Sequence, residues 1–351
     1  MKSALSGKPL LVAEGDIPTT RLLARVLEAG YGQVDVRTLD ALFGADIARS
    51  HVVLSRVCQP SHAWLPRYFA ARGLGYLYFL DDNFWELTPE VDAHLAPFYQ
   101  HPAVIESLDS FVAAASATVV MSDRLAKYIR ARFPGAKVEY VNPPFDVELV
   151  RQLLATTAPS ERPAGQLRIG YPTSRRNSVA PLLVPVVRHV AQKYAGSVEF
   201  DFVGWMPDNL ACLPGVCLHP QITDYNEYLH FKISRRWDIG LAPLLGRLFE
   251  GCKTNNKYRE YGGCRVAGIY SRVSPYSESV VHKQNGYLSE NTVDEWIFSL
   301  ETLISSPSLR TTIVENAFID VDRNYSQQAT ARHWVEMARP YANECRVSMA
   351  A

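Results

Sequence analysis

Short apolar runs alternate with amphipathic segments along this chain of 351 residues. In its first part, the runs at 10–13, 52–57 and 76–80 have the length and the flanking turns of strands. Between them, residues 19–29 and 63–71 carry apolar side chains at helical spacing. Strands that alternate with helices predict a parallel, doubly wound α/β sheet, whose ligands bind beyond the carboxyl ends of the strands.

The same pattern starts again at residue 167, after a stretch that resembles a linker. Residues 151–165 lose the apolar periodicity and gain threonine, serine, proline and charged residues. A chain of this length also exceeds what one core usually supports. We therefore predict a first domain over 1–147, a linker over 148–166 and a second domain over 167–327.

Composition and simple motifs exclude several classes of protein. Lysines and arginines number 36, as do aspartates and glutamates, so no net charge attracts nucleic acid. The six cysteines show no CxxC spacing for zinc and are too few for a disulfide scaffold. Neither an apolar run of membrane-spanning length nor a signal peptide is recognisable, so a cytoplasmic location is expected. No GxGxxG follows the first strand, which disfavours a nicotinamide enzyme.

The most informative stretch is residues 249–271, which predicts a loop, a helix and a strand. Thr254 is expected to cap the helix, leaving the amides of Asn255 and Asn256 directed out of its first turn. Helix amino ends attract anions, because their amides are unpaired and the helix dipole is positive there.

Three charged residues of this stretch recur at helical spacing: Lys253, Lys257 and Glu260. Amides and ammonium groups neutralise a diphosphate, and a carboxylate accepts both hydroxyl protons of a ribose cis-diol. This combination suits a nucleotide sugar. The alternative is a surface helix with an ordinary Lys-Glu pair.

Asp81 and Asp82 follow the strand at 76–80 directly, which places both carboxylates at the ligand-binding edge of the first sheet. Such a pair can bind acceptor hydroxyls, take a proton from an attacking hydroxyl or hold a metal. The alternative is that Asp82 and Asn83 cap the turn before Phe84.

The predicted helix over 124–133 carries four basic residues beside apolar ones. A basic amphipathic helix can lie on an anionic membrane surface. However, every outer helix of an α/β sheet is amphipathic, and the pattern favours that interpretation over a membrane contact.

The order of motifs in the second half resembles a known family. WDIGLAP at 237–243 is followed by the Lys253–Tyr261 segment, the strand GIYS, SPY at 274–276 and NGYL at 285–288. This order is similar to the C-terminal domain of GT-B glycosyltransferases of the group 1, family 4-like kind. The resemblance implies two Rossmann-like doubly wound domains that face a cleft. It also implies that residues 328–351 form a last helix that packs back on the first domain.

The resemblance also implies roles for particular residues. Glu260 matches the family's ribose-binding glutamate, whereas Cys252 stands where an earlier acid is usual. Arg265 and Ala267 stand where a glycine and a proline usually make the turn into the strand.

Further roles follow for the donor and the acceptor. Arg175 or Arg176 would contact the donor phosphates, and Trp205 would stack on the base or belong to the core. Lys253, Lys257 and the amides after Thr254 would stabilise the leaving diphosphate. Asp81 or Asp82 would orient the acceptor, and neither a cofactor nor a metal is expected.

The expected function is hexosyl transfer from a nucleoside diphosphate sugar to a glycan or lipid-linked sugar. By analogy, this would serve bacterial cell-surface polysaccharide synthesis, in the cytoplasm and with peripheral contact to the inner face of the plasma membrane through the 124–133 helix. Two alternatives remain: a catalytically inactive GT-B scaffold or binding subunit, and a nucleotide-sugar epimerase of the same fold.

Overall fold

The computed structural model describes residues 8–15, 17–44, 47–174 and 176–347. The chain forms two compact units. The first contains the chain up to Pro144, the short segment Gly251–Thr254 and the part from Tyr325 onward. The second contains Phe145–Glu250 and Asn255–Asn324.

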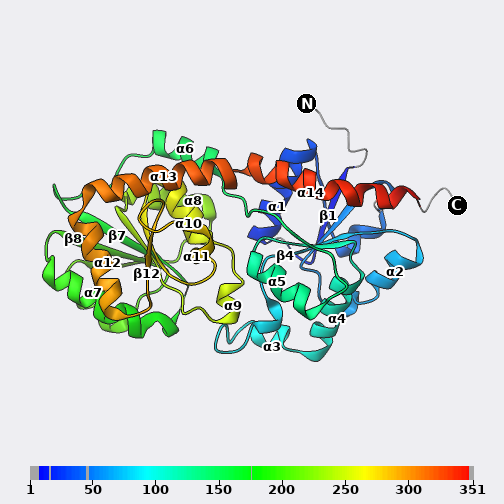
Figure 1. Ribbon diagram of the computed structural model, residues 1–351, viewed down its shortest axis with the longest axis horizontal. Coiled ribbons are helices and arrows are strands. Elements are labelled where there is room, and N and C mark those ends of the chain that lie inside the picture. The colour runs from blue at the N-terminus through cyan, green and yellow to red at the C-terminus, as the bar shows by residue number, and fades with distance from the viewer. Residues whose placement is uncertain (1–7, 16, 45–46, 175, 348–351) are drawn as a thin grey trace. The chain divides into compact units, whose positions relative to one another are not determined.

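The first unit is built on a six-stranded parallel sheet in the order β2-β1-β3-β4-β5-β6 (Figure 1). Its strands are β1 Pro9–Ala13, β2 Asp35–Thr38, β3 His51–Ser55, β4 Leu77–Leu80, β5 Ala117–Val120 and β6 Val138–Tyr140. Because the direction of winding changes between β1 and β3, ligands are expected beyond the carboxyl ends of those strands.

Helices surround this sheet. They are α1 Pro18–Tyr31, α2 Leu65–Ala71, α3 Ala96–Tyr99, α4 Pro102–Ala114, α5 Asp123–Arg132 and α14 Gln327–Val347. The apolar stripe of α1 and residues of α14 bury the same face of the sheet, and Trp334 of α14 lies 6.2 Å from the ring of Phe79 in β4. The last helix is therefore part of the first unit's core.

The second unit also holds a six-stranded parallel sheet, in the order β12-β11-β10-β7-β8-β9. Its strands are β7 Leu167–Pro172, β8 Val198–Val203, β9 Val216–His219, β10 Ile239–Ala242, β11 Ala267–Ser271 and β12 Tyr287–Ser289. Its helices are α6 Val147–Thr156, α7 Ala180–Lys193, α8 Tyr225–Arg235, α9 Leu248–Gly251, α10 Asn256–Gly263, α11 Tyr276–Ser279, α12 Val293–Ser305 and α13 Pro307–Tyr325. The winding reverses between β7 and β10, as in dinucleotide-binding folds.

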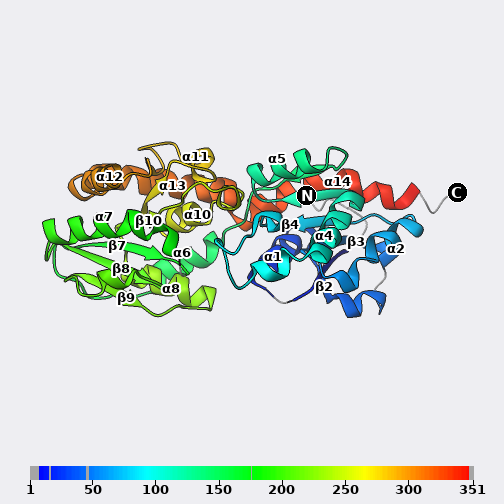
Figure 2. The ribbon, with the colours of Figure 1, turned by 90° about the horizontal axis from the view of Figure 1, so that it is seen from below.

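Helices cover both faces of this second sheet (Figure 2). On one face, α7 and α12 bury a continuous apolar cluster with β7 and β8. On the other, two paired glycines let aromatic rings approach the backbone. A β-carbon on Gly170 would lie 2.0 Å from the indole of Trp237, and one on Gly240 would lie 2.6 Å from the ring of Tyr261. The glycines thus fix how closely α10 packs on the sheet.

The doubly wound fold predicted from the alternating pattern is confirmed, but several elements were not predicted. The expected linker at 148–166 begins with α6, which Asp146 caps by accepting a hydrogen bond from the amide of Leu149 at 3.0 Å. Strand β9 is a sheet edge with two exposed residues, so its apolar signal is weak. Helix α4 and strand β12 were likewise missed.

Candidate functional site

The strongest candidate site lies on α10, the helix that follows the reversal of winding in the second unit. Glu260 is near its middle, and its carboxylate has four donors. Oε2 accepts hydrogen bonds from the hydroxyl of Tyr228 at 2.9 Å and from the ammonium groups of Lys232 at 2.9 Å and Lys257 at 3.2 Å. Oε1 accepts from Nδ2 of Asn256 at 2.8 Å. The carboxylate is therefore held in one orientation.

The charge of Glu260 is stabilised from two sides. Burial by itself would raise the pKa of Glu260, but the ammonium groups of Lys232 and Lys257 outweigh it and hold that pKa well below its usual range. Burial lowers the pKa of Lys257, and the neighbouring cations Lys232 and Arg176 add to this effect against the attraction of Glu260. Glu260 is thus an ionised acceptor at neutral pH.

Lys232 is the less expected of the two cations, because its side chain is fully buried. Its ammonium nitrogen lies 4.5 Å from the ring centre of Tyr228 and 5.4 Å from that of Tyr261. Aromatic faces attract cations, so the rings compensate part of the hydration that Lys232 loses. The sequence contains one indication that Lys232 is buried: it lies between Leu229 and Ile233 on the apolar side of α8.

The predicted cap of α10 was wrong. The helix begins at Asn256, and its N-cap is Asn255 rather than Thr254. The side chain of Asn255 makes no capping bond, because its amide nitrogen donates to Ser279 at 2.9 Å and its oxygen accepts from Arg259 at 2.9 Å. The asparagine side chains therefore stabilise the helix and Glu260, and the role proposed for the first-turn amides stays a prediction.

Lys253 does not share the helical face of Lys257 and Glu260, because it precedes the first turn of α10. In the first unit, its ammonium nitrogen lies 3.4 Å from Oδ1 of Asp82. The neighbouring thiol of Cys252 is completely buried and accepts a hydrogen bond from Nδ2 of Asn83 at 3.4 Å. Burial raises the pKa of Cys252, so the thiol stays neutral.

The two predicted aspartates of the first unit differ in their surroundings. Asp81 accepts a hydrogen bond from Thr19 at 2.8 Å, and both of its oxygens lie 3.3 Å from the guanidinium group of Arg56. Arg56 follows β3 with a φ of 57° and stacks 4.6 Å above the ring of Phe84. Burial raises the pKa of Asp81 although Arg56 opposes it. Asp81 thus belongs to a local ion-pair network.

Asp82 is the more accessible aspartate, with a side chain 26% exposed. The alternative that Asp82 and Asn83 cap the following turn by their side chains is not what the structure contains. Asn83 is the N-cap residue of the 3-10 turn Phe84–Glu86, but its side chain makes no capping bond. Asp82 is therefore the better placed of the two for an exogenous hydroxyl.

The remaining predicted donor residues have different outcomes. Arg175 lies outside the described residues. Arg176 ends the loop after β7, and its charge acts on Lys257. Trp205 is half-buried against the core of the second unit, in agreement with the packing alternative. Glu250, which was not predicted, is buried and accepts a hydrogen bond from the amide of Leu245 at 3.0 Å.

Three of the four basic side chains of helix α5 bond to residues of the first unit. Lys127 pairs with Asp123 at 2.5 Å, Arg130 donates to the carbonyl of Val138 at 2.6 Å, and Arg132 pairs with Asp109 at 2.9 Å. These bonds favour the interpretation of α5 as an ordinary outer helix over contact with a membrane. Within the described ranges, none of the helices combines the length and the apolar character needed to cross a membrane.

The two six-stranded parallel units define the GT-B fold of glycosyltransferases, and comparison with solved structures supports this assignment. Sucrose-phosphate synthase from Thermosynechococcus elongatus is similar over 95% of this chain and 99% of that one, with a TM-score of 0.68 at 14% identity. HepE from Anabaena, solved in complex with UDP, is similar over 95% and 100%, with a TM-score of 0.62 at 14% identity.

A glycosyltransferase from Rickettsia africae ESF-5 is similar over 97% of this chain and 98% of its own, with a TM-score of 0.63 at 11% identity. The sequence itself matches no protein-family profile and none of the curated proteins. The likeness therefore lies in the fold, and the predicted resemblance to GT-B glycosyltransferases is confirmed at that level.

Proposed function

We propose that this protein transfers a sugar from a nucleoside diphosphate sugar to a hydroxyl group of a glycan or glycolipid. The fold supports the first half of this proposal, since similar structures are glycosyltransferases and HepE was solved with UDP and with UDP-glucose. We further propose that this sugar transfer contributes to bacterial cell-surface polysaccharide synthesis.

The observation that carries the proposal is the ionised Glu260 on α10. A carboxylate offers about four acceptor positions, and four protein donors contact that of Glu260. Tyr228 and Lys232 approach from the buried face of α8, whereas Asn256 and Lys257 lie on α10 itself. Oε1 accepts the bond from Asn256 and keeps a second acceptor position for one hydroxyl of a ribose cis-diol. The other hydroxyl would replace Lys257 at Oε2, since the side chain of Lys257 is 23% exposed.

This exchange would also place a positive charge next to the diphosphate of the donor. Once displaced by ribose, the ammonium group of Lys257 is free to contact the adjoining diphosphate together with Arg176. Cations placed where negative charge develops on a leaving group lower the barrier to its departure. We assign the same task to Lys253.

We assign the acceptor contact to Asp82 and a positioning role to Asp81. Asp81 is already engaged by Arg56 and Thr19, whereas the side chain of Asp82 is 26% exposed. Asp82 would orient the acceptor hydroxyl and, in an inverting reaction, take its proton.

One observation favours a second candidate, an inactive scaffold or binding subunit of the same fold. The carboxylate of Glu260 is almost fully buried and satisfied by protein donors, as a purely structural glutamate would be. An enzyme should release nucleoside diphosphate slowly from its donor even without acceptor, whereas a scaffold should release none.

The test begins with thermal shifts in UDP, GDP, dTDP, CDP and CMP, because a ligand that binds only the folded chain raises its melting temperature. Calorimetry with the preferred nucleotide then compares Glu260→Ala with Glu295→Ala, an exposed glutamate of the same unit. Loss of the charge-assisted contacts should cost about 1.5–3 kcal/mol of binding free energy in Glu260→Ala alone. Equal dissociation constants in both variants would refute the role of Glu260.

A further inference from the structure

A groove lies at the edge of the second sheet where strands β7 and β10 begin. Asp238, directly before β10, and Arg162, before β7, line this groove, which has a volume of about 570 Å³. The end of α8, the turn after α10 and the first turns of α13 complete its walls. Pockets for small molecules usually measure about 300–1,000 Å³.

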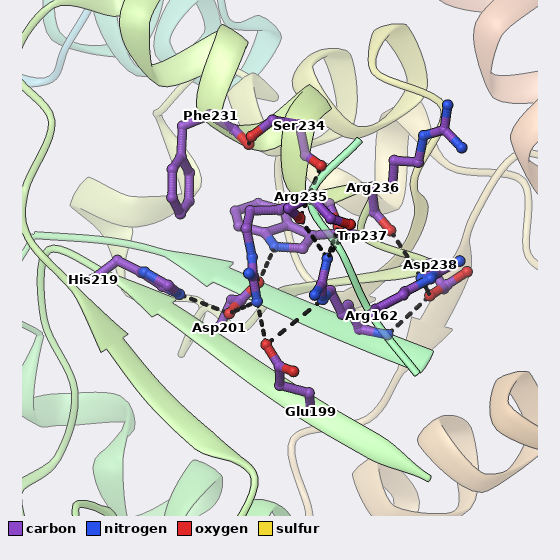
Figure 3. A network of polar contacts seen from close by, with 12 residues as sticks. Arg162, Glu199, Asp201, His219, Phe231, Ser234, Arg235, Arg236, Trp237 and Asp238 are labelled. Atoms are coloured by element: carbon purple, nitrogen blue, oxygen red, sulfur yellow. Dashed lines mark hydrogen bonds and ion pairs between the residues drawn. The ribbon is translucent and has the colours of Figure 1, made fainter. Parts of the chain in front are cut away.

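Arg162 and Asp238, which line the groove, belong to a wider network of polar contacts (Figure 3). Arg162 donates to Oδ2 of Asp238 at 2.7 Å and to the carbonyl of Arg236 at 3.3 Å. Beside them, Asp201 accepts hydrogen bonds from Arg235 and from the indole of Trp237, both at 2.8 Å. The charges of this network are therefore compensated by partners within the unit.

The walls carry positive charge that is not compensated in this way. Arg236, Arg265 and Arg310 line the groove together with Glu315, which forms no ion pair among the residues that the structure describes. Arg310 donates to the carbonyls of Leu303 and Ile304, which carry no net charge. Within the described ranges, the guanidinium group of Arg236 has no hydrogen bond or ion pair, and Figure 3 shows it extending away from the network.

Two of these arginines occupy backbone positions that favour glycine. Arg236 ends α8 with a φ of 50°, and Arg265 follows α10 with a φ of 60°. A β-carbon makes this left-handed conformation costly, and glycine or asparagine is the usual residue at such helix ends. Attraction to the helix carboxyl ends accounts for positive charge there, but not for two arginines that converge on one groove.

The groove also has an apolar side. Leu154, Ile233 and Val314 line it next to the arginines, and the guanidinium group of Arg265 stacks 3.9 Å above the ring of Phe318. A ligand that satisfies both sides combines an anionic group with a less polar body. Guanidinium groups bind phosphate oxygens in a bidentate manner, which makes phosphate the anion of choice.

We propose that the arginines of this groove bind the phosphate group of a small phosphorylated molecule or of a lipid headgroup. Lys232 also lines the groove, but its ammonium group pairs with Glu260 at 2.9 Å, so the phosphate contacts are assigned to the arginines alone. The site does not rest on the proposed transferase activity, because none of the three arginines takes part in the assignment of donor or acceptor.

The experiment is a calorimetric titration of the full chain with inorganic pyrophosphate at constant ionic strength. The groove variant is Arg236→Gln/Arg265→Gln, and its charge-matched control is Arg188→Gln/Arg323→Gln, which removes two exposed arginines elsewhere in the same unit. A third variant, Lys253→Ala/Lys257→Ala, reports on pyrophosphate bound at the candidate donor site. The same proteins are sedimented with phosphatidylcholine vesicles with and without phosphatidic acid.

We expect the groove variant to bind pyrophosphate at the groove at least tenfold more weakly than the wild type, while the charge-matched control binds unchanged. Lys253→Ala/Lys257→Ala should keep the groove binding and lose only pyrophosphate held at the candidate donor site. Vesicle binding that requires phosphatidic acid and is lost in the groove variant identifies a lipid headgroup as the source, and its absence identifies a soluble phosphate. Failure of the wild type to bind pyrophosphate, equal binding by the groove variant, or weakening only in Lys253→Ala/Lys257→Ala would overturn the proposal. If the double groove variant does not fold, Arg236→Gln alone provides the test.

Discussion

The ammonium nitrogen of Lys232 lies 2.9 Å from Oε2 of Glu260, and the two side chains are 0% and 3% exposed. A buried ion pair contributes little when intact, because both partners lose hydration, but breaking it leaves an uncompensated buried charge. The pair therefore couples α8 to α10 at the candidate nucleotide site.

Lys232→Met should destabilise the chain by about 3–5 kcal/mol, since it leaves Glu260 with Lys257 as its one charged partner among the described residues. Urea unfolding measures the change. The double variant Lys232→Met/Glu260→Gln should recover much of the loss, because the buried charge is removed together with its partner. A double variant as unstable as Lys232→Met would mean that the packing of the lysine stem, not its charge, is what α8 contributes.

The pH dependence of stability should reflect Glu260. Its pKa is lower in the folded chain than in the unfolded one, so the unfolded state binds more protons as the pH falls. The stabilisation is complete above about pH 4.3, the ordinary pKa of glutamate, and is lost below it as the pH approaches the folded pKa. Comparison of urea unfolding for wild type and Glu260→Gln should show the steeper acid loss in the wild type; parallel curves would contradict the assignment.

The two aspartates after β4 should separate into a functional and a structural residue. Asp82→Asn should lower transferase turnover by roughly a hundredfold or more with little change in melting temperature. Asp81→Asn should lower the stability by about 1–3 kcal/mol, because it weakens the buried bonds to Arg56 and Thr19. Steady-state rates and thermal unfolding of both variants distinguish the roles, and the reverse pattern would exchange them.

Lys253→Ala should reduce turnover more than it reduces donor affinity, if its charge acts on the departing diphosphate. Single-turnover kinetics and calorimetry on the same preparation give the two quantities. A loss confined to the dissociation constant would indicate that Lys253 binds the ground state instead.

Gly240→Ala tests the close packing of α10 on the second sheet. The new methyl group would lie 2.6 Å from the ring of Tyr261, and overpacking of this kind costs about 1–3 kcal/mol. Gly135→Ala is the matched control, because no atom lies within 4 Å of its added methyl group. Similar stabilities of the two variants in urea would show that Tyr261 can move aside.

Much of the fold followed from local patterns in the chain. The apolar runs at 10–13 and 167–171 predicted β1 and β7, because central strands of a parallel sheet are buried on both faces. Strand β9 was missed because it lies at the sheet edge, where alternate side chains meet solvent. Helix α6 was missed because its buried stripe is short, consisting of Val147 and Val150, and because its second half belongs to the polar stretch at 151–165.

The sequence by itself determined two doubly wound sheets and singled out Glu260, Lys257 and the aspartates after β4, since periodicity and residue type are local properties. The tertiary structure alone decided which charges meet. Lys232 reaches Glu260 across 28 residues and Arg56 reaches Asp81 across 25, and such contacts depend on how helices and strand ends are packed, which no local pattern records. For the same reason, the sequence could not identify Asp82, Arg236 and Arg265 as accessible charged residues. Only the structure shows which of the charges near them are already paired.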